Sequence, residues 1–461
     1  MRFVVSMILT RWMAKDQFGL MALVLAASGL FETLTEIGVR QSVIQNKQGD
    51  TAEFLNAAWW FSGIRGVALY IVGVIAAPGV ASFFHGGPEF VPLLRVAFLT
   101  MLFSGLTNPA LYVLEKNLQF GRYVWIVQGS ALAGTGLCLG MAMWIPNVWA
   151  LVAGVVAQAF LRFLGSFLFC HFRLSFHYDR QPWGELLHFS RGMVGLPILT
   201  YLFMQADILF LGRMIDKELL GLYSQALTLA TIPQMLFASI AVPMILPVLS
   251  EVQDSHGQLR SRLLRMTRLL FLFGLPMTTC LAVFSKSILT IVYGDQYAQA
   301  SGVFGILSFY TILFLSGTII YYTYISIGRP ELHRRFTIVR VVIMGLVLYP
   351  AIVWFGVIGA AGARLICLIL AGLLQQITLS RLIHLPVLQY LTTLKEGAIL
   401  SLAVLLPALL ARQLAQMPIV EVGIAGGLCG SVWAYILWSQ RESIRNLFSI
   451  NKVSVSTEGL P

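Results

Sequence analysis

Long apolar runs follow one another along almost the whole chain, and only short polar segments separate most of them. Thirteen of these runs reach the roughly 20 residues that a membrane-spanning helix needs, and a shorter apolar stretch precedes them at residues 1–13. The thirteen runs lie near 17–37, 55–82, 90–112, 123–145, 148–170, 187–212, 219–248, 267–293, 300–327, 336–355, 357–380, 396–415 and 419–438. The pattern therefore predicts an all-α polytopic membrane protein with about 14 transmembrane helices.

A weak internal repeat divides this series of runs. Residues 8–20 read ILTRWMAKDQFGL and residues 210–222 read FLGRMIDKELLGL, so the two segments share an Arg, a Lys, an acidic residue and a Gly-Leu pair in register. The repeat predicts two pseudo-symmetric six-helix bundles, at 1–180 and 181–392. An extra helix pair at 393–440 and a cytoplasmic tail at 441–461 would follow them. Paired halves with a binding site between them are typical of transporters.

The repeat also predicts that the first helix is truncated. The stretch at 1–13 is about half as long as the run that precedes the second copy. Thirteen residues of helix are about 20 Å long, which is short for a hydrocarbon core of about 30 Å. We expect the translated chain to begin upstream of Met1, with a truncated first helix as the alternative.

Composition agrees with a membrane protein and argues against an enzyme. The chain is 58% hydrophobic and 11% charged, whereas soluble domains average about 45–50% and about 25%. The five cysteines lie in or beside apolar runs without metal-binding spacing, so we expect packing residues, no metal and no cofactor. The sequence carries no motif for a nucleophile or a phosphate-binding loop, and no catalytic residue is assigned.

The net charge of +11 is best explained by membrane topology. If the N-terminus is cytoplasmic, nineteen Lys and Arg residues fall in inner loops and six in outer loops. This excess follows the positive-inside rule and predicts that both termini are cytoplasmic. Residues 261–270 form a basic amphipathic stretch suited to an anionic inner leaflet. No basic tail or solvated domain is present, so nucleic acid is not an expected partner.

Several short motifs carry a family resemblance that covers about residues 8–385. They are KDQFGL at 15–20, EIGV at 36–39, SVIQ at 42–45, QADILFLGR at 205–213, LGLYS at 220–224, YGDQYA at 293–298 and IGRPE at 327–331. Together they resemble the polysaccharide-transporter branch of the multidrug/oligosaccharidyl-lipid/polysaccharide exporter superfamily, the Wzx-type lipid-linked oligosaccharide flippases. The last two predicted helices are similar to the extra pair of its fourteen-helix members.

The resemblance implies a function as well as a fold. It implies that the chain moves a polyprenyl-diphosphate-linked oligosaccharide across the bacterial inner (cytoplasmic) membrane by alternating access, for O-antigen, exopolysaccharide or capsule biosynthesis. Its partners would be this lipid-linked oligosaccharide, membrane lipids and a polysaccharide polymerase or export machinery.

Two other functions remain open. One is a drug/cation antiporter of the same fold, although the excess of intramembrane Arg over acidic residues argues against a cationic substrate. The other is a membrane glycan polymerase, although no sizeable outer loop is present to hold an acceptor.

Arginines within the predicted spans are the candidate substrate-binding residues. A charge near the bilayer centre costs at least about 2.5–3.5 kcal/mol, so it usually faces a cavity or a partner. Guanidinium groups match the phosphate oxygens of the implied substrate in a bidentate way. The candidates are Arg65, Arg95, Arg162 and Arg364. The alternative for each is a side chain that extends to the interface or pairs with an acid.

Acidic residues and basic pairs complete the candidate set. The candidates for coupling transport to an ion gradient are Asp207, Glu32 and Glu36. Asp207 would take up and release a proton, or else form a structural ion pair. An outer gate that holds the substrate phosphate would consist of the repeat-related residues Arg11, Lys15, Arg213 and Lys217. The alternative is that these four are solvated loop ends balanced by nearby acids.

Overall fold

The protein is built entirely from helices. A computed structural model describes residues 2–34, 38–170, 175, 182–187, 195–414 and 417–439. Within these ranges nine helices are long and apolar enough to cross a membrane, or up to eleven if each bent helix pair counts as one span. This confirms the prediction of an all-α polytopic membrane protein. The finer count of about fourteen spans remains a prediction.

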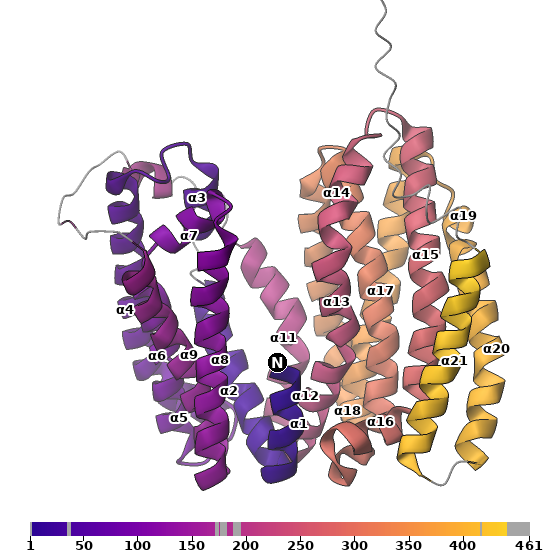
Figure 1. Cartoon of the computed structure of the whole chain (residues 1–461), viewed down its shortest axis with the longest axis horizontal. Helices are drawn as coiled ribbons and strands as arrows, with labels where there is room; N and C mark the ends of the chain where they lie inside the picture. Colours follow the sequence, from indigo (N-terminus) through magenta and orange to yellow (C-terminus); the bar gives the residue numbers. More distant parts are fainter. Residues whose placement is uncertain are drawn as a thin grey trace, which may run out of the picture. The chain divides into compact units, whose positions relative to one another are not determined.

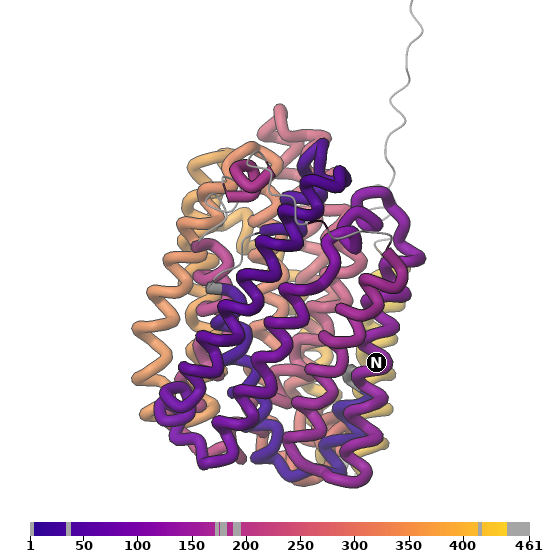
Figure 2. The backbone as a smooth tube through the Cα atoms, turned by 90° about the vertical axis from the view of Figure 1, so that its left-hand side faces the viewer, coloured from indigo at the N-terminus to yellow at the C-terminus, as the bar shows by residue number. Residues whose placement is uncertain are grey.

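The chain forms two compact units, and the first contains Met1–Leu229, Val292–Val303 and Arg334–Cys367. Its N-terminal helices lie side by side and nearly parallel, as the purple part of the tube in Figure 2 shows. Its helices are α1 (Arg2–Trp12), α2 (Lys15–Leu34), α3 (Val39–Gln45), α4 (Ala52–Phe83), α5 (Phe90–Ala97), α6 (Leu99–Leu106), α7 (Ala110–Lys116), α8 (Phe120–Trp144), α9 (Val148–Phe169), α11 (Leu196–Met214), α12 (Lys217–Ala230) and the short η1 (Asp295–Ala300).

The second unit contains Ala230–Ile291, Phe304–His333 and Leu368–Pro461. The axes of its long helices α15, α17, α20 and α21 are roughly aligned with one another (Figure 1). Its helices are α13 (Ile232–Ile240), α14 (Val242–Ser250), α15 (His256–Val283), α16 (Ser285–Tyr293), most of α17 (Ser301–Ser326), α19 (Val387–Leu391), α20 (Thr393–Leu414) and α21 (Pro418–Ser439). The remaining helix, α18 (Pro330–Ile383), contributes residues to both units. The predicted bundle boundaries at 180 and 392 stay predictions, and residue 180 and the tail at 441–461 lie outside the described residues.

Breaks within the helices explain where the predicted spans differ from the observed ones. α18 has 54 residues and is broken at Gly356, whose φ of 56° is accessible to glycine. This break separates the predicted spans 336–355 and 357–380. The predicted span 219–248 is three helices, α12, α13 and α14, with a bend of 47° before α14. Pro233 and Pro243 lie in the first turns of α13 and α14, where a missing N–H is tolerated.

Two other spans are displaced from their predicted positions. The predicted span 90–112 consists of α5 and α6, followed by a bend of 63° into α7. The predicted span 267–293 begins eleven residues earlier, at His256, and α15 ends at Val283 before α16. The basic stretch 261–270 is therefore part of the same continuous helix as the apolar residues that follow it.

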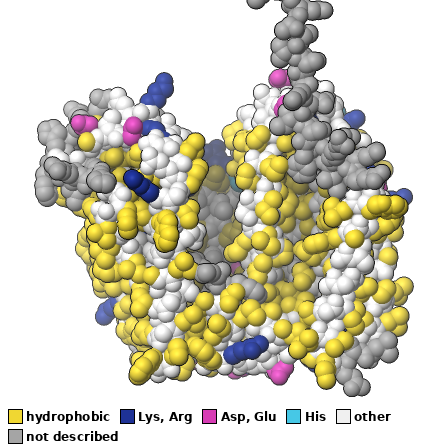
Figure 3. All heavy atoms as spheres, in the orientation of Figure 1, with side chains coloured by type: hydrophobic (Ala, Val, Ile, Leu, Met, Phe, Trp, Pro, Cys, Tyr) yellow, Lys and Arg dark blue, Asp and Glu magenta, His cyan; other side chains and the backbone are white. Residues whose placement is uncertain are grey.

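Large apolar side chains cover the outside of many helices. Ile75, Leu168 and Leu346 are 73%, 76% and 72% exposed. Figure 3 shows hydrophobic side chains over most of one face, with few Lys and Arg residues between them. A soluble protein does not expose so many large apolar residues, so these helix faces are suited to lipid.

The structure reproduces the sequence repeat. α1 ends at Trp12 and α2 begins at Lys15, and the aligned positions Met214 and Lys217 are where α11 ends and α12 begins. The repeat-related glycines also make reciprocal contacts. A Cβ added to Gly19 would overlap the carbonyl oxygen of Lys217, and one added to Gly221 would overlap that of Lys15. The two copies are thus packed backbone to backbone at equivalent positions.

Candidate functional site

A buried ion pair is the most unusual feature of the first unit. Arg364 Nε lies 3.1 Å from Asp207 Oδ2, and the two side chains are 3% and 0% exposed. Arg364 also donates a hydrogen bond to the backbone carbonyl of Met204, and the Tyr223 hydroxyl donates to the Asp207 carboxylate. The three side chains come from α18, α11 and α12. The structure therefore pairs two residues that the sequence identified separately.

A second arginine lies close to this ion pair. The guanidinium of Arg340 lies 5.8 Å from the centre of the Phe203 ring, and Cys367 donates a hydrogen bond to the Arg340 carbonyl. Cys367 lies about one helical turn after Arg364 on α18. Arg340 is one of the nineteen basic residues that the positive-inside pattern places in inner loops. The structure places it within α18 instead, so this region holds two cations and one carboxylate.

The N-terminal helices bring two further predicted arginines into one neighbourhood. Arg65 on α4 donates a hydrogen bond of 2.8 Å to the backbone carbonyl of Glu32. Arg162 on α9 donates a hydrogen bond of 2.9 Å to the hydroxyl of Ser104 on α6. Both α4 and α9 pack against α6. Both guanidinium groups therefore donate hydrogen bonds to oxygen atoms of neutral groups.

The other intramembrane candidates are less confined. Arg95 is exposed in the last turn of α5, and in the described part of the chain it forms no ion pair. Glu32 is exposed near the end of α2, and it meets Arg65 through its backbone carbonyl. Glu36 lies outside the described residues. The structure thus links Glu32 to Arg65 but does not bring Arg95 to the other arginines.

Two residues of the proposed outer gate contact other parts of the protein. Lys15 forms an ion pair of 2.7 Å with Glu218. Arg213 donates a hydrogen bond to the Phe83 carbonyl, and its guanidinium lies 4.9 Å from the centre of the Phe83 ring. Arg11 is exposed and Lys217 is half-buried. The ion pair supports the alternative in which nearby acids balance these residues.

Sequence reasoning missed a pocket of uncharged polar groups in the same unit. This pocket of about 360 Å³ is lined by side chains of α1, α2, α8, α9 and α12. The Ser6 hydroxyl donates a hydrogen bond of 2.9 Å to the Gln225 amide oxygen across it. The polar lining residues are Ser6, Thr135, Gln158, Ser224, Gln225 and Thr228. Neutral polar side chains spaced along apolar helices change mean hydropathy little, so only their spatial convergence reveals them.

The described residues contain no group of three or more His, Cys, Asp and Glu side chains that would hold a metal ion. What they offer is guanidinium groups, a buried carboxylate and neutral hydrogen-bonding groups. Such an arrangement can bind anions and hydroxyl-rich molecules.

Comparison with known proteins gives consistent matches. A profile of the family described as "Polysaccharide biosynthesis protein" matches residues 8–302. The chain is 24% identical to the teichuronic acid biosynthesis protein TuaB of Bacillus subtilis over 287 residues, which cover 61% of this chain and 58% of TuaB. It is 23% identical to the lipopolysaccharide biosynthesis protein WzxC of Escherichia coli over 361 residues, which cover 78% of this chain and 72% of WzxC.

Among solved structures, the lipid II flippase MurJ in an inward closed conformation has a similar fold. The TM-score is 0.72, with 14% identity over 96% of this chain and 98% of MurJ. At that identity the likeness concerns the fold alone.

Proposed function

The chain belongs to the polysaccharide biosynthesis protein family of Wzx-type transporters, and from that premise we propose that it flips a lipid-linked oligosaccharide across the inner membrane. The substrate would be a polyprenyl-diphosphate-linked oligosaccharide destined for a surface polysaccharide. The family consists of transporters and not enzymes, so no bond is made or broken. The observation that carries the proposal is the family match over residues 8–302.

The arginines of the first unit support an anionic substrate. Arg65 on α4 and Arg162 on α9 lie within apolar helices, and each donates a hydrogen bond, to the Glu32 carbonyl and the Ser104 hydroxyl respectively. A phosphate group can accept two parallel hydrogen bonds from one guanidinium, which a single carbonyl or hydroxyl oxygen cannot do. We therefore assign the substrate diphosphate to Arg65 and Arg162. Arg95 and Arg364 remain candidates, with Arg364 held by Asp207 in this conformation.

The polar pocket supports a sugar as the other part of the head group. Its amide and hydroxyl groups match sugar hydroxyls, which both donate and accept hydrogen bonds. Ser6 and Gln225 face one another across it at 2.9 Å, so a sugar hydroxyl would replace one partner in that bond. The polyprenyl tail would stay in the surrounding lipid.

The topology forms part of the same proposal. In this topology α18 crosses the membrane twice, once on each side of its break at Gly356, and α2 crosses it once. The helices then match the thirteen predicted spans, and α1 is the preceding half-length helix. Transport would then proceed by alternating access, with both termini in the cytoplasm. Asp207 would couple transport to an ion gradient. An outer gate that holds the substrate phosphate would consist of Arg11, Lys15, Arg213 and Lys217.

Deletion of the gene in its host tests the flippase function directly. We expect loss of surface polysaccharide and accumulation of lipid-linked oligosaccharide on the inner leaflet, both reversed by the wild-type gene. The Arg65→Gln/Arg162→Gln variant should restore at most about one tenth of the polysaccharide, because a hydrogen bond to a charged group contributes about 1.5–3 kcal/mol.

The matched control is Arg381→Gln, because Arg381 is an exposed arginine in the last turn of α18. This variant should restore surface polysaccharide to the wild-type level. Unchanged polysaccharide together with no accumulated lipid in the deletion strain would contradict the proposal. Increased drug sensitivity in that strain would instead favour the antiporter.

A further inference from the structure

A cationic groove lies in the second unit, between the start of α15 and the α19–α20 segment. Its cavity measures about 720 Å³. On α15 the lining residues include Gly257, Ser261, Leu264 and Arg268, which recur every three or four positions and so share one helix face. The charged side chains of the groove are Arg260, Arg265, Arg268, Lys395 and Glu396.

The charges of this groove are not balanced within it. Arg268 and Glu396 form a bidentate pair, with Nε–Oε2 at 2.9 Å and Nη2–Oε1 at 2.5 Å. Arg260 donates a hydrogen bond of 3.3 Å to the carbonyl of His384. Arg265 and Lys395 are exposed and have no ion-pair or hydrogen-bond partner in the described part of the chain. Three positive charges thus remain without a counter-charge, and a bound anion would relieve their repulsion.

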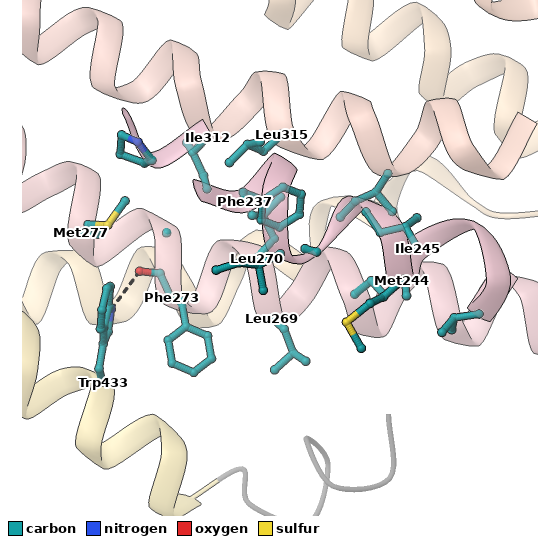
Figure 4. A pocket seen from close by; sticks show the side chains of 17 residues that line it. Phe237, Met244, Ile245, Leu269, Leu270, Phe273, Met277, Ile312, Leu315 and Trp433 are labelled. Atoms are coloured by element: carbon teal, nitrogen blue, oxygen red, sulfur yellow. Dashed lines mark hydrogen bonds between the residues drawn. The ribbon is translucent and has the colours of Figure 1, made fainter. Parts of the chain in front are cut away.

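The surroundings indicate which kind of anion fits. Leu269 lines both this groove and an apolar cavity of about 360 Å³, formed by α13, α14, α15, α17 and α21. Figure 4 shows Leu269, Leu270 and Phe273 along the α15 side of that cavity, and the Trp433 indole donates a hydrogen bond of 3.2 Å to the Phe273 carbonyl. A cationic groove that adjoins an apolar cavity matches a phosphate head group attached to an acyl chain.

We propose that this groove binds the phosphate of an anionic membrane phospholipid. Its lining residues do not include Arg65, Arg162 or any residue of the polar pocket to which we assign the substrate, so the bound lipid is distinct from the transported substrate. The proposed topology places the groove on the cytoplasmic side, where anionic lipids attract basic segments. Inorganic phosphate would make the same contacts with the basic side chains, but it has no acyl chain to occupy the apolar cavity.

Calorimetric titration of the purified full chain tests this site. The ligands are dioctanoyl phosphatidylglycerol, dioctanoyl phosphatidylcholine as the neutral head group, and inorganic phosphate as the anion without acyl chains. We expect phosphatidylglycerol to bind the wild-type protein most tightly. The Arg265→Gln/Lys395→Gln variant should bind it roughly 25-fold more weakly, since each cation near an anionic lipid contributes about fivefold in affinity.

A second variant should change the affinity in the opposite direction. Glu396→Gln removes the single carboxylate among the charged lining residues and releases Arg268, so phosphatidylglycerol should bind about fivefold more tightly. The Arg381→Gln control, a basic residue that does not line the groove, should leave the affinity unchanged. Equal affinity for the two lipids, equally tight binding of inorganic phosphate, or an equal loss in the control would each overturn the proposal.

Discussion

At the scale of single residues, the decisive feature is the fully buried pair of Asp207 and Arg364. Desolvation of two charges is offset only when the geometry is good and further hydrogen bonds are made. Tyr223 and the Met204 carbonyl supply such bonds, one to each partner. The pair can therefore persist within an apolar helix bundle, and each partner depends on the other.

This dependence predicts the behaviour of variants. Asp207→Asn leaves Arg364 as an uncompensated buried cation, so it should lower the free energy of unfolding by about 3–5 kcal/mol. The double variant Asp207→Asn/Arg364→Gln should recover much of that loss. Thermal unfolding of the purified proteins measures both effects. A single variant as stable as the wild type would show that the pair does not form.

The double variant also separates a structural role for Asp207 from a coupling role. If Asp207 couples transport to an ion gradient, a stable double variant should transport independently of that gradient. Transport that stays gradient-dependent and undiminished would leave only the structural role.

The sequence identified Asp207 and Arg364 as unusual charges but did not predict that they pair. They are far apart along the chain, and only the packing of α11 against the second part of α18 brings them together. Tyr223 and the polar pocket around Gln225 were not predicted at all, since neutral polar residues are common within apolar helices. The sequence thus indicates which buried charges need a partner, and only the tertiary structure identifies the residue that pairs with each of them.

At the scale of helices, the contact between α2 and α12 limits side-chain size at two equivalent positions. Gly19 and Gly221 each lie against the backbone of the other helix, at the carbonyls of Lys217 and Lys15. A backbone carbonyl cannot move aside as a flexible side chain can. Any side chain at these positions therefore forces the two helices apart.

We expect Gly19→Ala and Gly221→Ala to have similar effects, because the two contacts are equivalent. An ordinary overpacking substitution destabilises a protein by about 1–3 kcal/mol, and each of these substitutions should destabilise the fold by more than that. Each should therefore reduce both the yield of folded protein and the transport activity. Fluorescence-detected gel filtration and surface polysaccharide measure the two losses. The matched control is Gly140→Ala in α8, where an added Cβ meets nothing within 4 Å. A tolerated alanine at either position would contradict the reciprocal contact.

Helix positions could be predicted from hydropathy, but their ends and bends could not. Apolar runs mark most of the helices, and Pro233 and Pro243 mark two of the breaks within the run at 219–248. The start of α15 was not predicted, because its first turns are basic and the hydropathy scale cannot distinguish an amphipathic turn from a loop. The bend of 63° between α6 and α7 lies at a turn that contains Asn108 and Pro109. Hydropathy did not reveal this turn, because the residues around it are apolar.

At the scale of the whole molecule, the distribution of basic residues fixes the proposed orientation. Gly87 lies in a predicted outer loop and Gln253 in a predicted inner one, and both positions are exposed. In a cysteine-free background, a membrane-impermeant maleimide should label the Gly87→Cys variant in intact spheroplasts. It should label the Gln253→Cys variant only after permeabilisation. Labelling of Gln253→Cys in intact spheroplasts would reverse the orientation.

The reciprocal glycine contact also leaves no room for compensating substitutions. What Gly19 does to α12, Gly221 does to α2, which is the relation that an isologous dimer interface imposes on two identical subunits. Because both obstacles are backbone carbonyls, no change of side chain on the facing helix creates space for a larger residue at either glycine. A second substitution on α12 should therefore not rescue Gly19→Ala, and one on α2 should not rescue Gly221→Ala.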